Sequence, residues 1–426
     1  MSENNVNLSG VSKPFIVSAV ILVFAGSIIG SMWMMSLTGL EFFGFMRNSF
    51  SLHKTFQVDG FLVLLIMGVG YMIVPRFRNI PLASSELAYS SFIMVIFSIT
   101  ATLLSAFTNW HVSVLASFTQ LIGVSIFSGI LIWTLRVHPK LLRIADYFIG
   151  LSVVILVVIS LFHLIQGVIP IGEVAGAAER GSDGNQLSQL QMLLLFAILM
   201  IFGVEYKTLP SFLGFVRPRK KLAVVSFGLG VLCVILGVFS MINPNILLAE
   251  IFNIVLLAFT IAFAAAVYIF GGFDNTEIMR ILRGERKARY SYISRHLSLA
   301  FLFLFGGIVL AGAFYVFGTF MLYDLAIHYT AIGFLGITIA LYLPLMLPPI
   351  TGRMMHFTKF SALPLILVVL ALVIRTTGHI LMTTQVATVF ASYIFMASGW
   401  MVVAALFAFI TMIHRSAKHE EVINES

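Results

Sequence analysis

Four histidines stand out in this very apolar chain: His53, His163, His328 and His379. Each falls near the predicted outer end of a different membrane-spanning helix. Ionisable side chains are costly to bury at membrane depth, and this cost makes them functional candidates. Histidine is also the commonest metal ligand in proteins. We therefore expect these four imidazoles to be candidate ligands for a metal or a metal-containing cofactor.

The composition is that of an integral membrane protein. The chain has 426 residues, of which 60% are hydrophobic and 10% charged, whereas soluble domains are roughly 25% charged. The net charge is +8, but the basic residues are sorted by loop, which indicates membrane topology and not nucleic-acid binding. Cys233 is the only cysteine, which excludes an internal disulfide and a CxxC motif for metal or c-type haem.

The hydropathy pattern predicts an all-α fold with twelve transmembrane helices. A span needs roughly 20 apolar residues, and twelve segments qualify, near 13–37, 53–75, 84–107, 113–136, 145–170, 187–209, 221–242, 246–272, 297–319, 323–348, 360–382 and 388–413. Alternate links carry Lys and Arg, and positive charge marks the cytoplasmic side. We expect a multi-pass protein of the cytoplasmic membrane with both termini cytoplasmic. His53 and His328 then begin the second and tenth helices, and His163 and His379 lie near the outer ends of the fifth and eleventh.

An internal repeat organises these helices. Residues 68–77 and 203–212 both fit G-V-x-Y-x-x-[V/L]-P-x-F, 135 residues apart, and Leu347-Pro348 falls 138 residues after the second proline. Repeats at a fixed period imply a repeated structural unit. The sequence predicts a single transmembrane domain of three pseudo-threefold four-helix units, near 13–136, 145–272 and 297–413. His53 and His328 would lie at similar depths in the first and third units, and Ser188 stands at the corresponding place in the second.

Two such histidines suggest haem. A low-spin haem takes two imidazoles on opposite faces of its iron, and the ligands and their surroundings set its redox behaviour. The small residues Gly60, Gly333 and Gly336 would allow close approach of a macrocycle, or equally close packing of helices.

Arg375 is the candidate partner of the haem propionates. It lies one turn before His379 and therefore on the same helix face. The alternative for Arg375 is a salt bridge with Asp59 or Glu250. For Asp59 itself, we expect a hydrogen bond with a neighbouring helix, with a role as a proton relay as the alternative.

The motifs resemble a known family. His328-x4-Gly333-x2-Gly336, followed by Thr351-Gly352-Arg353, resembles the H-x4-G-x2-G and T-G-R pattern of NnrS proteins, and His53-x6-Gly60-Phe61 resembles their first-half motif H-x-H-x4-G-F. The twelve-helix, threefold plan is also similar to subunit I of haem-copper oxidases. The resemblance implies haem b held between the second and tenth helices by His53 and His328. It also implies a link to nitric oxide or respiratory electron transfer, and copper as a second metal, for which His163 and His379 are the remaining candidates.

The chain departs from this pattern where oxidases bind copper. Thr55 replaces the second histidine of the first NnrS motif, residues 186–210 and 221–243 contain no histidine, and the tenth helix has His328 alone. We therefore expect a degenerate copper site and no standard oxygen-reducing centre. The protein would be an oxidoreductase component whose partners are membrane lipids, other respiratory-chain subunits or a small redox protein.

Two other functions fit the same topology. Twelve helices with repeats and basic inner loops also describe a secondary transporter without a cofactor, although transporter repeats usually form two halves. The chain could also be a structural subunit of a respiratory complex. Haem absorbance of the purified chain, or substrate uptake by proteoliposomes without a cofactor, would discriminate between these functions.

Overall fold

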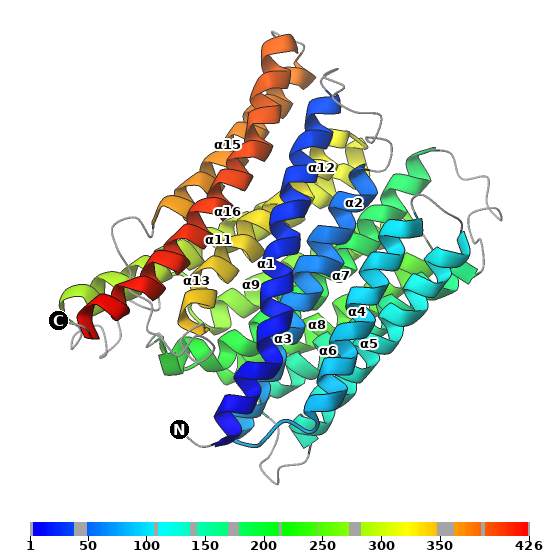
Figure 1. The fold of residues 1–426 in the computed structure, drawn as a ribbon. Coiled ribbons are helices and arrows are strands. Elements are labelled where there is room, and N and C mark those ends of the chain that lie inside the picture. Colours follow the sequence, from blue (N-terminus) through cyan, green and yellow to red (C-terminus); the bar gives the residue numbers. More distant parts are fainter. Residues whose placement is uncertain are drawn as a thin grey trace. The chain divides into compact units, whose positions relative to one another are not determined.

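The structure is a computed structural model, and it describes residues 3–37, 49–105, 110–136, 143–168, 179–212, 215–243, 245–271, 283–346, 362–384 and 388–424. Pro348 and the Thr351-Gly352-Arg353 motif lie outside these residues. The described elements are all helices: α1 (Glu3–Leu37), α2 (Ser49–Thr55), the π-helix η2 (Phe56–Val63), α3 (Leu64–Arg78), α4 (Ser85–Ser105), α5 (Trp110–Arg136), α6 (Ile144–Val168), α7 (Glu179–Phe212), α8 (Lys220–Ile242), α9 (Ile246–Ala266), α11 (Gly284–Phe317), α12 (Phe320–His328), the π-helix η4 (Tyr329–Gly336), α13 (Ile337–Met346), α15 (Leu363–Thr383) and α16 (Thr388–Asn424) (Figure 1).

The prediction of an all-α, twelve-span membrane protein is confirmed. Within the described ranges, twelve helical stretches are long and apolar enough to cross a membrane. The largest differences from the predicted bounds concern the eighth and ninth spans. Helix α9 ends at Ala266 and not near 272, and Tyr268 follows with a φ of 57° that no α-helix adopts. Helix α11 begins at Gly284, before its apolar stretch, because Glu, Arg, Lys and Ala are good helix formers.

The chain divides into two compact units. The first comprises Met1–Lys140, Leu156–Ile171 and Leu343–Ser426, and the second comprises Leu141–Ile155 and Gly172–Tyr342. Helices α6 and α13 therefore contribute to both. The threefold arrangement of four-helix units concerns the placement of these parts relative to one another, and it stays a prediction.

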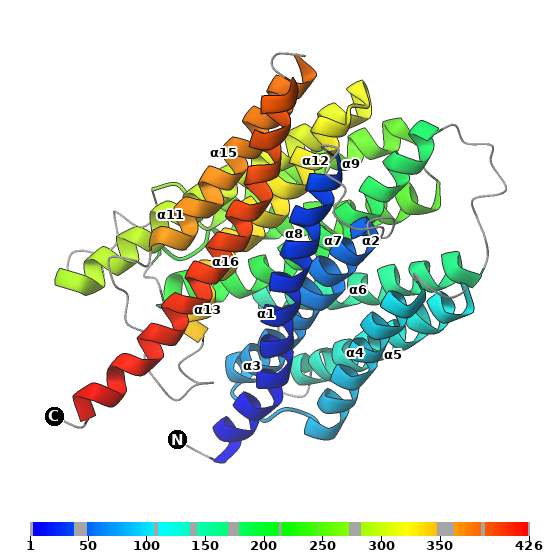
Figure 2. The same ribbon diagram turned by 45° about the horizontal axis from the view of Figure 1, so that its top comes forward.

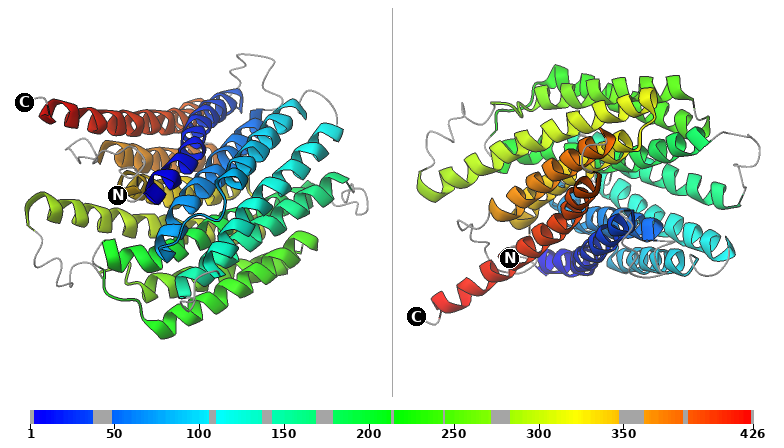
Figure 3. Two further views of the ribbon diagram at one scale, coloured as in Figure 1. Left: turned by 60° about the horizontal axis from the view of Figure 1, so that its bottom comes forward. Right: turned by 90° about the horizontal axis from the view of Figure 1, so that it is seen from above.

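In the first unit, α1 packs along α2, η2 and α3 and also against α16 (Figure 2). Two antiparallel hairpins, α4–α5 and α15–α16, have the most extensive contacts of this unit (Figure 3). Small residues allow the close packing. A Cβ on Gly378 of α15 would lie 2.8 Å from the backbone nitrogen of Phe395 in α16. Backbone contact of this kind is what glycine allows at helix crossings in membranes.

In the second unit, α7 contacts α8, α9 and η4, and α11 runs beside α9, α12 and η4. Its centre is aromatic. The Phe202 ring of α7 stacks on Phe263 of α9, and both lie near parallel to Phe301 of α11, with Phe334 of η4 edge-on to Phe301 at 5.2 Å. Offset and edge-to-face ring pairs stabilise beyond the area they bury. These four helices are therefore held to one another by a shared ring cluster.

Local contacts support a relation between the first two repeats. Tyr71 of α3 hydrogen-bonds Ser91 of α4 at 2.8 Å. The residues 135 positions later, Tyr206 of α7 and Ser226 of α8, also face each other, although no hydrogen bond closes between their hydroxyls. The same tyrosine-to-serine contact thus joins the second and third helices of both repeats, beyond the ten-residue motif that first indicated the repeat.

The first and third repeats share a different feature, an eight-residue π-helical segment after the histidine. The segments Phe56–Val63 and Tyr329–Gly336 are 273 residues apart, which places Gly333 in register with Gly60. In this register His328 corresponds to Thr55, so His53 precedes the equivalent position by two residues. The two histidines lie at similar depth, as predicted, but they do not occupy equivalent positions, because the register follows the π-helices and not the prolines.

Candidate functional site

His53 lies in α2, three residues before the π-helix η2, and its ring rests on two glycines of α1. Its Nδ1 donates a hydrogen bond to the carbonyl oxygen of Gly26 at 2.8 Å. A Cβ on Gly30 would lie 2.6 Å from His53 Cε1, so only glycine leaves room for the ring there. With the proton on Nδ1, the lone pair is on Nε2, which is the tautomer that ligates a metal through Nε2.

His328 is held in the same tautomer by its own helix. It ends α12, directly before the π-helix η4. Its Nδ1 lies 2.7 Å from the carbonyl oxygen of Asp324 and 3.2 Å from the carboxylate oxygen Oδ1 of the same residue. A carboxylate beside the second ring nitrogen orients an imidazole and raises its basicity as a ligand. Asp324 is 3% exposed, and the sequence reasoning missed it although its spacing of four residues from the histidine was visible.

The π-helices set these two positions apart from the other spans. π-helical segments are rare and occur frequently at functional sites. Among the described helices, the two segments that exceed a single turn follow His53 and His328. Because the two histidines belong to different units, the expectation that their rings face one another across a haem stays a prediction.

The glycines near these histidines pack against helices. A Cβ on Gly60 would meet Leu22 of α1 at 3.0 Å, and a Cβ on Gly333 would meet Phe303 of α11 at 2.6 Å. Of the two interpretations offered for Gly60 and Gly333, close helix packing is the one that the contacts support. A Cβ on Gly336 would have ordinary contact only, at 3.5 Å from the Ala331 carbonyl.

Four polar side chains gather near His53 in the first unit: Lys54, Asp59, Gln120 and His163. Gln120 Nε2 of α5 donates to Asp59 Oδ1 at 3.2 Å, which confirms the predicted hydrogen bond from Asp59 to a neighbouring helix. Lys54 interacts electrostatically with Asp59 and with His163 of α6. Residues five apart lie about 140° apart around an α-helix, whereas a π-helix bonds residue i to i+5. The π-helix therefore helps to bring Asp59 to the side of Lys54.

Arg375 and His379 share one face of α15, as their spacing predicted. The His379 ring meets the Phe395 ring of α16 edge-on at 4.5 Å, and the Arg375 guanidinium lies 5.0 Å from the same ring's centroid. Arg375 also contacts the sulfur of Met34 in α1 at 3.3 Å. Both side chains are buried. A cation over an aromatic face is stabilised by the ring quadrupole, so part of the interaction of Arg375 is with Phe395, while its role toward a propionate stays a prediction.

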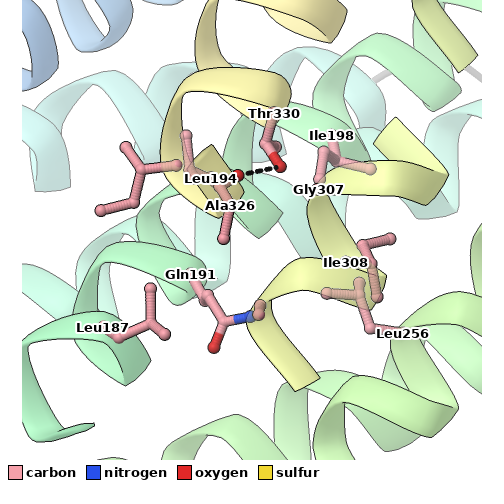
Figure 4. A pocket seen from close by; sticks show the side chains of 11 residues that line it. Leu187, Gln191, Leu194, Ile198, Leu256, Gly307, Ile308, Ala326 and Thr330 are labelled. Atoms are coloured by element: carbon pink, nitrogen blue, oxygen red, sulfur yellow. Dashed lines mark hydrogen bonds between the residues drawn. The ribbon is translucent and has the colours of Figure 1, made fainter. Parts of the chain in front are cut away.

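A small pocket lies beside α12 and η4 in the second unit (Figure 4). Its walls are mostly apolar, with the Gln191 amide of α7 as the main polar group. That amide is already engaged, because its Nε2 donates to Asn253 at 2.7 Å and its Oε1 accepts from Tyr315 at 3.1 Å. Ser188, at the place of His53 in the second repeat, joins this network through Tyr315. The second repeat thus fills the histidine position with a hydroxyl and amide network.

Metal-ligating residues do not gather into a larger cluster in the described part of the chain, where no three His, Cys, Asp or Glu side chains are placed to share a metal ion. His163 and His379 are therefore not shown to act together with His53. Compared with known families and with curated proteins, the chain matches no family model and no curated sequence.

Proposed function

We propose that this chain is a haem b-binding membrane protein in which His53 and His328 are the axial ligands, acting in electron transfer or nitric oxide-related respiratory metabolism. The observation that carries the proposal is shared by both residues. Each imidazole has Nδ1 hydrogen-bonded to a backbone carbonyl, which leaves the Nε2 lone pair for a metal, and each precedes a π-helical segment. The resemblance to NnrS proteins and to haem-copper oxidases supports the same pair.

The residues present fit a bis-histidine haem at the level of the ligands. A haem supplies one-electron chemistry. Asp324 would tune one ligand by accepting its Nδ1 hydrogen, and Gly26 and Gly30 would position the other. Arg375 is the proposed cation for a propionate. Copper rests on the family resemblance alone.

The membrane and the side of the termini are part of this proposal. Arg76, Arg136 and the Arg283–Arg295 region lie in alternate links or helix ends, and Arg415 follows the last span. Because positive charge marks the cytoplasmic side, we propose a cytoplasmic membrane with both termini inside. Cysteine accessibility at either terminus in intact cells tests this orientation.

The test of the cofactor is spectroscopic. Purified protein should give a pyridine haemochrome of haem b and a reduced-minus-oxidised spectrum of bis-histidine haem, and His53→Ala or His328→Ala should lose it. His296→Ala is the matched control, because His296 makes the same Nδ1 contact to the carbonyl of Tyr292 at 2.7 Å without a π-helix after it. Folded protein without haem absorbance, or both variants retaining the spectrum, would refute the proposal.

A secondary transporter is the second candidate, and the polar group Lys54, Asp59, Gln120 and His163 favours it. Ionisable residues that pair within transmembrane helices mark substrate and ion pathways. Uptake by proteoliposomes that contain no haem, abolished in Asp59→Asn, would support transport over electron transfer.

A further inference from the structure

The second unit contains a buried carboxylate that nothing in the fold pairs. Glu205 of α7 is 1% exposed, and neither Oε1 nor Oε2 has a hydrogen-bond partner. Among the described residues, no Lys, Arg or His forms an ion pair with it. The Tyr342 hydroxyl of α13 faces this carboxylate and also lies beside the Thr208 hydroxyl, yet no hydrogen bond closes at Tyr342 Oη.

The unpaired atoms concentrate around this residue and its neighbours. Of the eight buried side-chain atoms without a partner in the described part of the chain, six belong to Glu205, Tyr206, Ser226, Thr338 and Tyr342. Buried polar groups are paired in most folded proteins, so unpaired ones call for an explanation such as a bound water or ion. Thr338 stands one turn before Tyr342 on α13, so its hydroxyl is on the same helix face.

The group around Glu205 has more lone pairs than hydrogens. Thr208 donates its hydroxyl hydrogen to the Val204 carbonyl at 3.0 Å, so its oxygen offers only lone pairs to the site. An ionised carboxylate offers acceptors only, and Tyr342 has a single hydrogen to donate. Such a set of carboxylate and hydroxyl oxygens is suited to a hard cation.

The fold does not require a carboxylate here. In the first repeat Gly70 stands at the position of Glu205, and the space beside it is occupied by Phe127 and Leu131, at 3.1 Å and 3.4 Å from where its Cβ would be. The helix packing is therefore compatible with an apolar filling. An ionised carboxylate at membrane depth is costly unless a positive charge balances it, which points to a ligand specific to the second repeat.

We propose that Glu205, Thr208 and Tyr342 form a binding site for a small monovalent cation, Na⁺, within the second unit. A monovalent ion balances the single carboxylate, whereas a divalent ion would leave a net positive charge in the membrane. The site is independent of the proposed haem, because its residues neither include nor adjoin His53 or His328.

The test is ion-specific stabilisation of the purified full-length protein. The melting temperature in detergent is measured as NaCl replaces choline chloride at constant ionic strength, with KCl and LiCl as comparisons, because a ligand of the folded state raises its stability. We expect a saturable rise with Na⁺ that is lost in Glu205→Gln and displaced to higher Na⁺ concentration in Tyr342→Phe. Tyr71→Phe, the same change in the first repeat, should keep the wild-type Na⁺ response.

Radioactive ²²Na⁺ binding and infrared spectroscopy complete the test. Wild-type protein should bind a single saturable ²²Na⁺, and Glu205→Gln should bind none. If Glu205→Gln does not fold, loss or weakening of binding in Thr208→Val and Tyr342→Phe carries the same conclusion. Absence of Na⁺ binding overturns the proposal, as does an infrared band of a protonated carboxyl, missing in Glu205→Gln, that persists at saturating Na⁺, because Glu205 would then be a permanently neutral acid.

Discussion

Replacement of Gly30 by alanine tests how His53 is positioned. The new Cβ would lie 2.6 Å from His53 Cε1 and 3.1 Å from Cγ, whereas ordinary contact begins at 3.4 Å. The ring must therefore move by about 0.8 Å away from α1. The same movement lengthens the bond from Nδ1 to the Gly26 carbonyl from 2.8 Å toward about 3.6 Å, a separation at which no hydrogen bond remains.

Three effects combine in the stability of Gly30→Ala. Alanine in place of glycine inside a helix gains roughly 0.5–1 kcal/mol. Overpacking costs about 1–3 kcal/mol, and loss of the hydrogen bond costs about 0.5–1.5 kcal/mol. The net expectation is a destabilisation of about 1–3 kcal/mol, together with loss of haem if His53 is an axial ligand.

The assay has an internal control in the same unit. Gly129 of α5 has no atom within 4 Å of where its Cβ would be, so Gly129→Ala should be neutral or stabilising. Both variants are unfolded by denaturant in detergent, and their haem content is measured by pyridine haemochrome. Equal stability and equal haem content of the two variants would refute the argument that the glycine groove of α1 positions the His53 ring.

Three further predictions follow from particular contacts. Gly378→Ala should destabilise the protein by about 1–3 kcal/mol in the same unfolding assay, because its Cβ would meet the backbone of Phe395 at 2.8 Å, whereas Gly312→Ala, with nothing within 4 Å, should not. Tyr71→Phe should cost about 0.5–1.5 kcal/mol through its lost bond to Ser91, and Tyr206→Phe, whose hydroxyl has no partner, should cost nothing measurable; equal losses would contradict the difference seen between the repeats. Asp324→Asn should raise the haem midpoint potential in a redox titration, because it removes an anion beside the His328 ligand, while Asp146→Asn, whose carboxylate accepts from the Arg143 amide, should leave the potential unchanged.

The sequence was sufficient for the spans and for the shared helix face of Arg375 and His379, because both follow from helical periodicity and hydrophobicity. It could not reveal where the backbone becomes π-helical, since neither Phe56–Val63 nor Tyr329–Gly336 has an unusual composition. The register of the repeats was therefore set on the prolines, and His53 was aligned with His328 when Thr55 is its counterpart. Glu205 was read only as part of a motif, because nothing in sequence shows that a carboxylate lacks a partner.

The tautomer of a histidine does not by itself identify a ligand. His296 makes the same contact to the carbonyl four residues earlier as His328 does, at the same 2.7 Å, because any histidine in a helix can reach that acceptor. What distinguishes His53 and His328 is that the helix changes to π-helical geometry immediately after them, in two repeats that otherwise differ in sequence. A π-helix is less favourable than the α-helix it replaces, so its presence at the same register in both repeats argues for a role that an α-helix could not serve. If haem binding fails for both residues while the two π-helices are retained, that role must instead concern the polar group around Asp59, and the transporter candidate takes precedence.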